Sequence, residues 1–405
     1  MIVNSTNQYR SENRIINFQN TLKNMKTTDK IGMRNSPPSE SLSRLSGRLG
    51  EASSWKSNLE ESKKRYADWW NGKGIVLSMW EHLQKDGAPH ELISPPAPAR
   101  NLKQYWFDPL WRAENLHYQL SRSSFNADIL PVANTHLGPG SLAAMLGAEL
   151  DGGEDTIWIK HVEGKELNLA FNENDPAWKL HRDLLKACKA NAQGKYYVGC
   201  PDLVEGLDVL ASIRGTSETM MDMIMDPEGL EEQLQKVNDV YFQAFDRIYD
   251  IIREGDEMTF CYFSLWAPGK VSKLQCDLSI MISEEDYRRF VQPYIWEQCR
   301  KIDYTLYHLD GVDAQRHLEA ILEIKELNAI QWTPGVGQPQ GGDRCWYELY
   351  KRILSGGKSV MANWVTLDEL EPLLDNVGNQ GLHINVDFKS EKDIETALKI
   401  VDKYR

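Results

Sequence analysis

Two residues in the segment YHLDG, positions 307–311, have the types and spacing of a catalytic or metal-binding pair. His308 and Asp310 are two positions apart, and side chains at such positions of an extended strand point to the same side. Imidazole and carboxylate groups together suit Zn²⁺ in an open three-ligand site, in which His383 could be the third ligand. In the other interpretation no metal is bound, and Asp310 orients a His308 that hydrogen-bonds the substrate. The sequence leaves both open.

The elements that must position this pair are short strands that alternate with amphipathic helices. Eight segments are rich in β-branched or aromatic residues, at 74–80, 127–133, 195–200, 257–263, 303–309, 327–332, 358–364 and 381–386. Between most of them lie runs with apolar residues three and four positions apart, such as 230–252. This alternation predicts an α/β protein, and eight such units favour a closed (β/α)8 TIM barrel over an open sheet.

Active sites of TIM barrels lie at the carboxyl ends of the strands, so polar and aromatic residues near these ends are the binding candidates. Asp277, which lies outside the predicted strands, is a further catalytic candidate beside His308 and Asp310. The predicted substrate-binding residues are His136, Trp266, Gln275, Tyr307, Gln331, Trp332, Asn363 and Asn385. Tryptophan rings at strand ends would form a flat wall for a ring-shaped or extended substrate, although most tryptophans in a chain of this size belong to the core.

Two glycine-containing segments resemble nucleotide-binding motifs without meeting their requirements. Residues 138–143, GPGSLA, match a loose dinucleotide pattern, but they follow the second predicted strand and lack the later acidic residue that binds ribose. A helix-start loop, which could bind an anion, is the simpler interpretation. The segment GKS at 357–359 has Arg352 where a P-loop has glycine. We therefore expect neither NAD nor ATP as a cofactor.

The charge and composition exclude several classes of protein. The 405-residue chain has a formal net charge of −13, which argues against a nucleic-acid groove because phosphate binding needs clustered basic residues. It has no apolar stretch long enough to span a membrane and no signal peptide, so we expect a cytoplasmic protein. Its six cysteines include no C-x-x-C pair, which predicts reduced thiols rather than disulfides.

The first 50 residues differ from the rest of the chain. They hold eight basic residues against three acidic ones, with many Ser, Asn and Thr and weak apolar periodicity. Such composition is typical of a flexible arm. We therefore predict an N-terminal extension at 1–50 and one barrel domain at 51–405.

The strongest family resemblance lies in the segments around His308. YHLDG is followed by HLEAILEI (317–324) and AIQWTPG (329–335), and it is preceded by LDVLASIRG (207–215), LQCDLS (274–279) and ISEEDYRRFVQPY (282–294). Together these segments resemble the uroporphyrinogen decarboxylase domain superfamily, in a divergent branch related to corrinoid-linked methyltransferases. The resemblance covers most of residues 60–400 and implies a (β/α)8 barrel.

The resemblance implies one of two activities. Known members are uroporphyrinogen decarboxylases, which need no cofactor, or corrinoid-linked methyltransferases, which use zinc. The decarboxylases carry an Arg-Gln-Ala-Gly-Arg-Tyr stretch that grips propionate groups, and this chain lacks it. The methyltransferases bind zinc through a His-x-Cys on strand 5 and a Cys on strand 8; here His308-x-Asp310 stands at the first place, and His383 lies near the second. The resemblance therefore implies His308, Asp310 and His383 as metal ligands.

We expect a methyltransferase or demethylase that acts on a small methylated compound, with a corrinoid supplied by a partner protein. The alternative is a decarboxylase of uroporphyrinogen or another carboxylated ring, in which Asp277 or Asp310 stabilises a protonated ring while Trp266 and Trp332 stack on it. A binding protein that has kept the barrel is a third hypothesis. The family resemblance also favours a homodimer.

Overall fold

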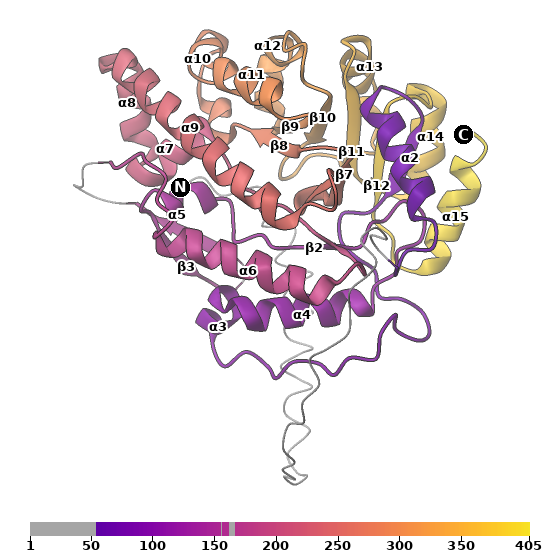
Figure 1. The fold of residues 1–405 in the computed structure, drawn as a ribbon. Helices are drawn as coiled ribbons and strands as arrows, with labels where there is room; N and C mark the ends of the chain where they lie inside the picture. Colours follow the sequence, from indigo (N-terminus) through magenta and orange to yellow (C-terminus); the bar gives the residue numbers. More distant parts are fainter. Residues whose placement is uncertain (1–53, 155, 162–166) are drawn as a thin grey trace, which may run out of the picture.

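The chain forms an α/β structure around a six-stranded parallel sheet (Figure 1). A computed structural model describes residues 54–154, 156–161 and 167–405. The predicted arm at 1–50 lies outside these described residues. In spatial order the sheet consists of β1 (Ile75–Ser78), β12 (Leu382–Val386), β11 (Ser359–Val365), β10 (Ala329–Thr333), β9 (Tyr304–Asp310) and β8 (Val271–Gln275). Every neighbouring pair in it is parallel.

Shorter strands form three further pairs. These are β2 (Val132–Ala133) with β5 (Tyr197–Val198), β3 (Glu149–Gly152) with β4 (Ile157–Lys160), and β6 (Met258–Phe260) with β7 (Leu265–Ala267). The β2–β5 pair is parallel, whereas the other two pairs are antiparallel. A parallel bridge between Cys200 and Phe260 links the end of β5 to β6. The α/β class with mainly parallel strands is therefore confirmed.

Three predicted strands differ from the structure: those at 127–133 and 195–200 are shortened to Val132–Ala133 and Tyr197–Val198, and the one at 257–263 changes direction. The segment predicted at 257–263 ends as a strand at Phe260 and turns back through Tyr262–Ser264 into the antiparallel β7. The parallel neighbour of β9 is instead β8, which the sequence prediction omitted. β8 has the sequence VSKLQ, and the lysine at its centre obscured a strand that is buried at every position.

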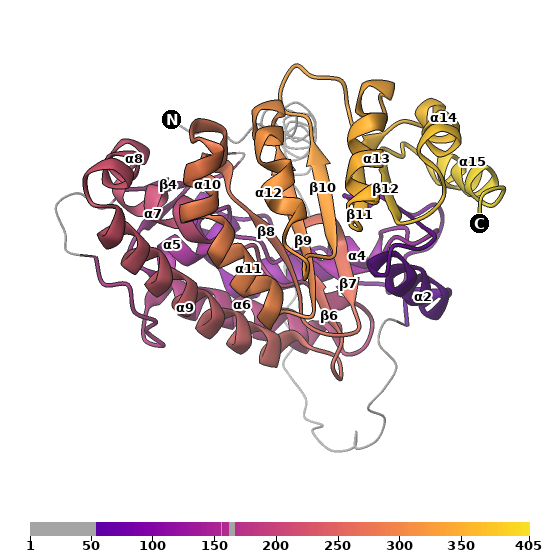
Figure 2. The same cartoon turned by 90° about the horizontal axis from the view of Figure 1, so that it is seen from above.

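Helices follow most strands and lie around them (Figures 1 and 2). They are α2 (Leu59–Trp70), α3 (Leu102–Phe107), α4 (Pro109–Ser121), α5 (Ser141–Met145), α6 (Pro176–Ala192), α7 (Gly206–Arg214), α8 (Thr216–Met225), α9 (Pro227–Ile252), α10 (Glu284–Phe290), α11 (Gln292–Lys301), α12 (Leu318–Leu322), α13 (Tyr347–Ser355), α14 (Leu367–Val377) and α15 (Glu391–Val401). Strands β1, β8, β10 and β12 are buried at every position, as expected where both faces of a parallel sheet are covered.

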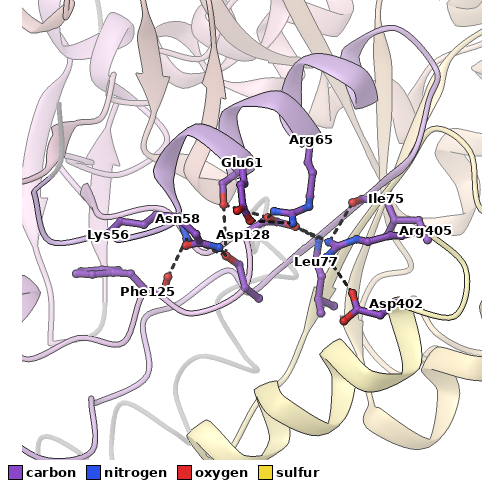
Figure 3. A network of polar contacts seen from close by, with 12 residues as sticks. Lys56, Asn58, Glu61, Arg65, Ile75, Leu77, Phe125, Asp128, Asp402 and Arg405 are labelled. Atoms are coloured by element: carbon purple, nitrogen blue, oxygen red, sulfur yellow. Dashed lines mark hydrogen bonds and ion pairs between the residues drawn. The ribbon is translucent and has the colours of Figure 1, made fainter. Parts of the chain in front are cut away.

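A buried carboxylate, Asp128, connects helix α2 near the start of the described chain to Arg405 at its end (Figure 3). Asp128 Oδ1 lies 3.0 Å from Arg65 Nη1 of α2, and its Oδ2 lies 2.7 Å from Arg405 Nη2. Its Oδ2 also accepts the backbone N–H of Leu77 in β1, at 3.0 Å. On the aromatic face of α2, Trp69 Nε1 donates to the backbone oxygen of Val360 in β11 at 3.1 Å.

Two further expectations concern the described residues. None of the helices within them is long and apolar enough to cross a membrane. The six cysteines all fall within the described ranges and are free thiols, as predicted.

Candidate functional site

Three side chains converge at the carboxyl ends of β8 and β9. Asp277 begins the turn after β8, while His308 and Asp310 are the fifth and seventh residues of β9. Their ligand atoms all lie within 4.8 Å of one another, and His308 Nε2 is 3.8 Å from Asp310 Oδ2. Within the ranges that the structure describes, this is the one group of His, Cys, Asp and Glu side chains close enough to hold a metal ion.

The hydrogen bonds of His308 determine which ring nitrogen faces the carboxylates. Gln331, its register neighbour on β10, donates through its side-chain amide to Thr333 Oγ1 at 2.9 Å. The Gln331 side-chain oxygen therefore accepts from His308 Nδ1. Burial lowers the pKa of His308 to about 3, and the charge of Lys273 acts in the same direction. The ring is thus neutral at pH 7, and the lone pair of Nε2 is directed toward Asp310.

Two buried carboxylates of the neighbouring loop and helix hold the segment that carries Asp277. Asp208 of α7 accepts the backbone N–H of Asp277 at 2.7 Å and that of Leu278 at 2.9 Å. Glu205, which precedes α7, accepts the backbone N–H of Gln275 at 2.6 Å. Burial raises the pKa of Glu205 well above its usual range and also raises that of Asp208. These contacts fix the backbone on both sides of Asp277.

The surroundings of Asp277 carry an excess of acidic groups. Lys273 Nζ lies 2.7 Å from Asp202 Oδ2, and both side chains are almost fully buried. Burial raises the pKa of Asp277 well above its usual range, and Asp208 and Asp310 raise it further. Lys273 interacts with the carboxyl groups of Asp202, Glu205, Asp208 and Asp277, and Asp277 also interacts with Asp310. A bound divalent cation would offset this excess, so the residues present fit a metal.

Aromatic rings lie beside His308. The ring centroids of Tyr262 and Phe263 are 6.1 and 5.6 Å from that of His308. Trp80, two residues after β1, packs on Phe263 at 4.6 Å and on Trp364 of β11 at 5.0 Å. Phe263 and Trp364 have φ angles of 65° and 54°, which side-chain-bearing residues rarely adopt. Such strain persists where the surroundings impose it, and it concentrates at functional sites.

A cavity of about 300 Å³ opens beside Asp277. Its walls come from the loops after β2 and β5, from the β3–β4 hairpin, from α7 and the start of α8, and from the end of β8. The lining residues are Pro139, Thr156, Ile157, Trp158, Ile159, His161, Val204, Asp208, Ala211, Ser212, Thr216, Gln275 and Asp277. The cavity thus reaches the metal-binding group through Asp277.

The glycine-rich loop at 138–143 supports one wall of this cavity. A Cβ atom on Gly140 would lie 1.7 Å from Ile159 Cδ1, so glycine lets the hairpin strand β4 pack directly on the loop. Ser141 starts α5 and hydrogen-bonds the buried His181 at 2.9 Å. In this structure the motif serves packing between the loop, the hairpin and α6.

His383 lies apart from the group to which the sequence assigned it. It shares a register row with His308, but three strands away, through Gln331 and Met361. Its ring packs edge-on against Tyr66 and Trp69 of α2, with centroid distances of 5.3 and 5.1 Å. Burial lowers its pKa to about 3. The predicted ligand set is corrected accordingly: Asp277, and not His383, accompanies His308 and Asp310.

Three aromatic candidates also lie away from the site. Tyr307 and Trp332 each neighbour an inward-facing residue, so strand alternation turns them toward the helices. Trp332 packs on Trp346 at 5.1 Å, and Tyr307 lies against Tyr287 of α10. Trp266 belongs to β7, where its Nε1 donates to Glu257 Oε2 at 3.1 Å. All three side chains are thus buried within the fold and apart from the metal-binding group, and their contact with substrate stays a prediction.

Three of the other predicted residues, Gln275, Gln331 and His136, lie in or near the site. Gln275 lines the cavity, Gln331 orients His308, and the His136 ring is 5.8 Å from that of Tyr262. Asn385 donates to Asn363 at 2.9 Å in the buried interior. Sequence reasoning missed Lys273, Glu205, Asp208, Tyr262 and Trp80. In the sequence, the clearest indication of these residues was the acidic pair Glu205 and Asp208, which are three positions apart at the start of α7.

Comparisons with known proteins provide a fold similarity. No family model matches the chain, and no curated protein matches it. Among solved structures, a methyltransferase from Methanosarcina mazei is similar, with 12% sequence identity and a TM-score of 0.50. The match covers 85% of this chain and 98% of that protein. At this identity the similarity concerns the fold.

Proposed function

We propose that this chain is a metal-dependent methyltransferase that acts on a small methylated compound at the carboxyl ends of its strands. The observation that carries the proposal is the convergence of Asp277, His308 and Asp310 beside a cavity of about 300 Å³. The fold similarity to a methyltransferase agrees with the proposal, and the site supplies the chemical argument that a fold alone lacks.

The same proposal includes a closed (β/α)8 barrel. Beyond the six-stranded sheet, the bridge from Cys200 to Phe260 connects β5 to β6. The backbone N–H of Asp128, just before β2, donates to the backbone oxygen of Leu77 in β1 at 2.9 Å. These contacts support a ring of strands, and the acidic group lies at the end of the strands where TIM barrels bind their substrates.

The donor set of one imidazole and two carboxylates suits Zn²⁺ in an open three-ligand site. When bound, such a metal supplies Lewis acidity toward the heteroatom that carries the methyl group. The chain's own residues prepare the site. Gln331 holds His308 in the tautomer with a lone pair on Nε2, and Asp208 fixes the backbone of Asp277. Orienting contacts of this kind raise metal affinity in other proteins.

A corrinoid protein is the proposed partner that exchanges the methyl group. Four apolar residues lie exposed after the strands at this edge: Ile280, Met281, Val312 and Val336, with 39–50% of their surface accessible. Apolar groups exposed around a polar site are typical of docking surfaces. The homodimer expected from the family resemblance stays a prediction.

Metal analysis of the purified full-length protein tests the proposal. We expect zinc to copurify with the wild type, and Asp277→Asn and His308→Ala each to weaken zinc affinity roughly 10- to 100-fold or more. Asp313→Asn is the matched control, because its carboxylate is 71% exposed and lies three residues beyond Asp310. If the wild type binds zinc no better than Asp277→Asn and His308→Ala do, the proposal is contradicted.

The decarboxylase alternative has less support. A substrate with several carboxylates needs basic groups to hold it. Here the group around Asp277 is acidic, and Lys273 is already paired with Asp202. Conversion of uroporphyrinogen by the purified protein would reverse this ranking.

A further inference from the structure

We infer that the cavity beside Asp277 binds an uncharged or cationic organic molecule about the size of one substituted ring, and that it discriminates against anions. The inference rests on the proposed function and specifies the class of substrate for that site. Three features of the cavity carry it: its volume, its apolar walls and the sign of its charges.

The volume sets the size of the ligand. At about 300 Å³ the cavity is at the lower end of the range for small-molecule sites, which runs from about 300 to 1,000 Å³. A single ring with short substituents fits such a space. A tetrapyrrole, with four rings and their side chains, does not.

The walls favour a ligand with an apolar body. Ile157 and Ile159 of β4 face the cavity from the hairpin, and Val204 and Ala211 face it from the β5 loop and α7. Trp158, which stands between the two isoleucines on β4, also contributes to the lining. Burial of apolar surface against such walls is the main source of affinity in small-ligand sites, while a few polar groups orient the ligand.

The charges determine which polar groups the ligand can carry. Asp208 and Asp277 line the cavity, and none of the lining residues that the structure describes is Lys or Arg. Two nearby basic side chains are already paired: Lys273 with Asp202 at 2.7 Å, and Arg214 with Asp222 at 2.5 Å. In the metal-free chain a carboxylate or sulfonate would lose its hydration without gaining a cationic partner, which is costly in a partly enclosed site.

Asp277 sets the direction of binding. It is the lining residue that also belongs to the metal-binding group. A ligand in the cavity therefore places its methyl-bearing heteroatom toward Asp277 and its apolar body between β4 and α7.

A matched series of ligands tests the inference by isothermal titration calorimetry on the full chain, after a chelator has removed any bound metal. The probes are 4-methoxybenzyl alcohol, 4-methoxybenzylamine and 4-methoxybenzoate, which are uncharged, cationic and anionic at pH 7. We expect the first two to bind at least about tenfold more tightly than the benzoate. Equal or tighter binding of the benzoate, or no binding of any probe at millimolar concentration, would overturn the inference.

A charge substitution locates the binding site. Thr216→Arg adds a cation to the half-buried lining at the start of α8. We expect it to shift the preference toward 4-methoxybenzoate by about tenfold or more. Thr396→Arg, on the exposed face of α15, is the control for the added charge. If both variants change the three affinities equally, the probes bind elsewhere and the inference is wrong.

Because these titrations contain no methyl acceptor, their outcome does not depend on turnover. A protein that binds the probes but no zinc would contradict the proposed function and leave the ligand class standing. A protein that binds zinc but prefers the benzoate would contradict the ligand class and leave the proposed function standing.

Discussion

Replacing Lys273 with methionine should destabilise the fold strongly. The Lys273 ammonium lies 2.7 Å from Asp202 Oδ2, and the two side chains are 0% and 4% exposed. Burial alone lowers the pKa of Lys273, but the carboxylates of Asp202 and Glu205 outweigh burial and raise it, so the group is charged. Methionine keeps an unbranched apolar stem and removes the charge. Asp202 would then remain buried without its partner.

The expected size of the effect follows from this burial. Removing one member of a buried ion pair costs about 3–5 kcal/mol of unfolding free energy. Lys403→Met is a control with the same substitution and the same distance, because Lys403 Nζ lies 2.7 Å from Glu371 Oε1. That pair is 60% and 46% exposed, and exposed pairs contribute about 0–1 kcal/mol.

Urea unfolding followed by tryptophan fluorescence measures both variants. The double variant Lys273→Met/Asp202→Asn should recover part of the loss, because it removes both buried charges together. If Lys273→Met costs no more than Lys403→Met, the reasoning about the buried pair is refuted.

Three further outcomes follow from buried polar groups. Asp128→Ala should lower the unfolding free energy by about 3–5 kcal/mol, because two arginines lose the carboxylate they share; a loss under about 1 kcal/mol in urea would contradict this. Burial lowers the pKa of His181 to about 4, so below pH 6.5 the unfolded chain binds a proton that the folded protein does not. Stability should therefore fall as the pH drops from 6.5 toward 4, by up to about 1.4 kcal/mol per pH unit from this group, and parallel stability curves for wild type and His181→Gln would refute that assignment. Gln331→Leu should weaken zinc binding roughly 10- to 100-fold by releasing His308, and unchanged affinity in a zinc titration would contradict its orienting role.

The pair His308 and Asp310 could be placed from the sequence because strand geometry is simple. Side chains two positions apart share a face of a strand, and the carboxyl end of a parallel strand is where polar residues gather. Asp277 was named through the family resemblance, as the residue that would stabilise a protonated ring in a decarboxylase, because the strand before it was not predicted. These three residues meet in the structure.

The same alternation explains where two of the predicted aromatic residues lie. Tyr307 neighbours His308 and Trp332 neighbours Gln331, so one member of each pair must face the helices. The period of the strand therefore favours His308 and Gln331 as the members that face the site.

Other differences depend on contacts between distant segments. His383 stands in the predicted register row, but nothing in its local sequence indicates that Tyr66 and Trp69 of α2 pack against it. Lys273 is charged within a fully buried strand, and its burial makes sense only once Asp202 is placed beside it.

The position of α2 has a consequence for how the chain folds during its synthesis. Trp69 hydrogen-bonds Val360, 291 positions later, and Arg405 contacts the backbone of Ile75, 330 positions earlier. The ribosome therefore releases α2 long before the strands that cover its aromatic face exist. Until β11 and β12 have been translated, this face stays open to solvent and to chaperones, and such long-range closure is a slow, late step of folding.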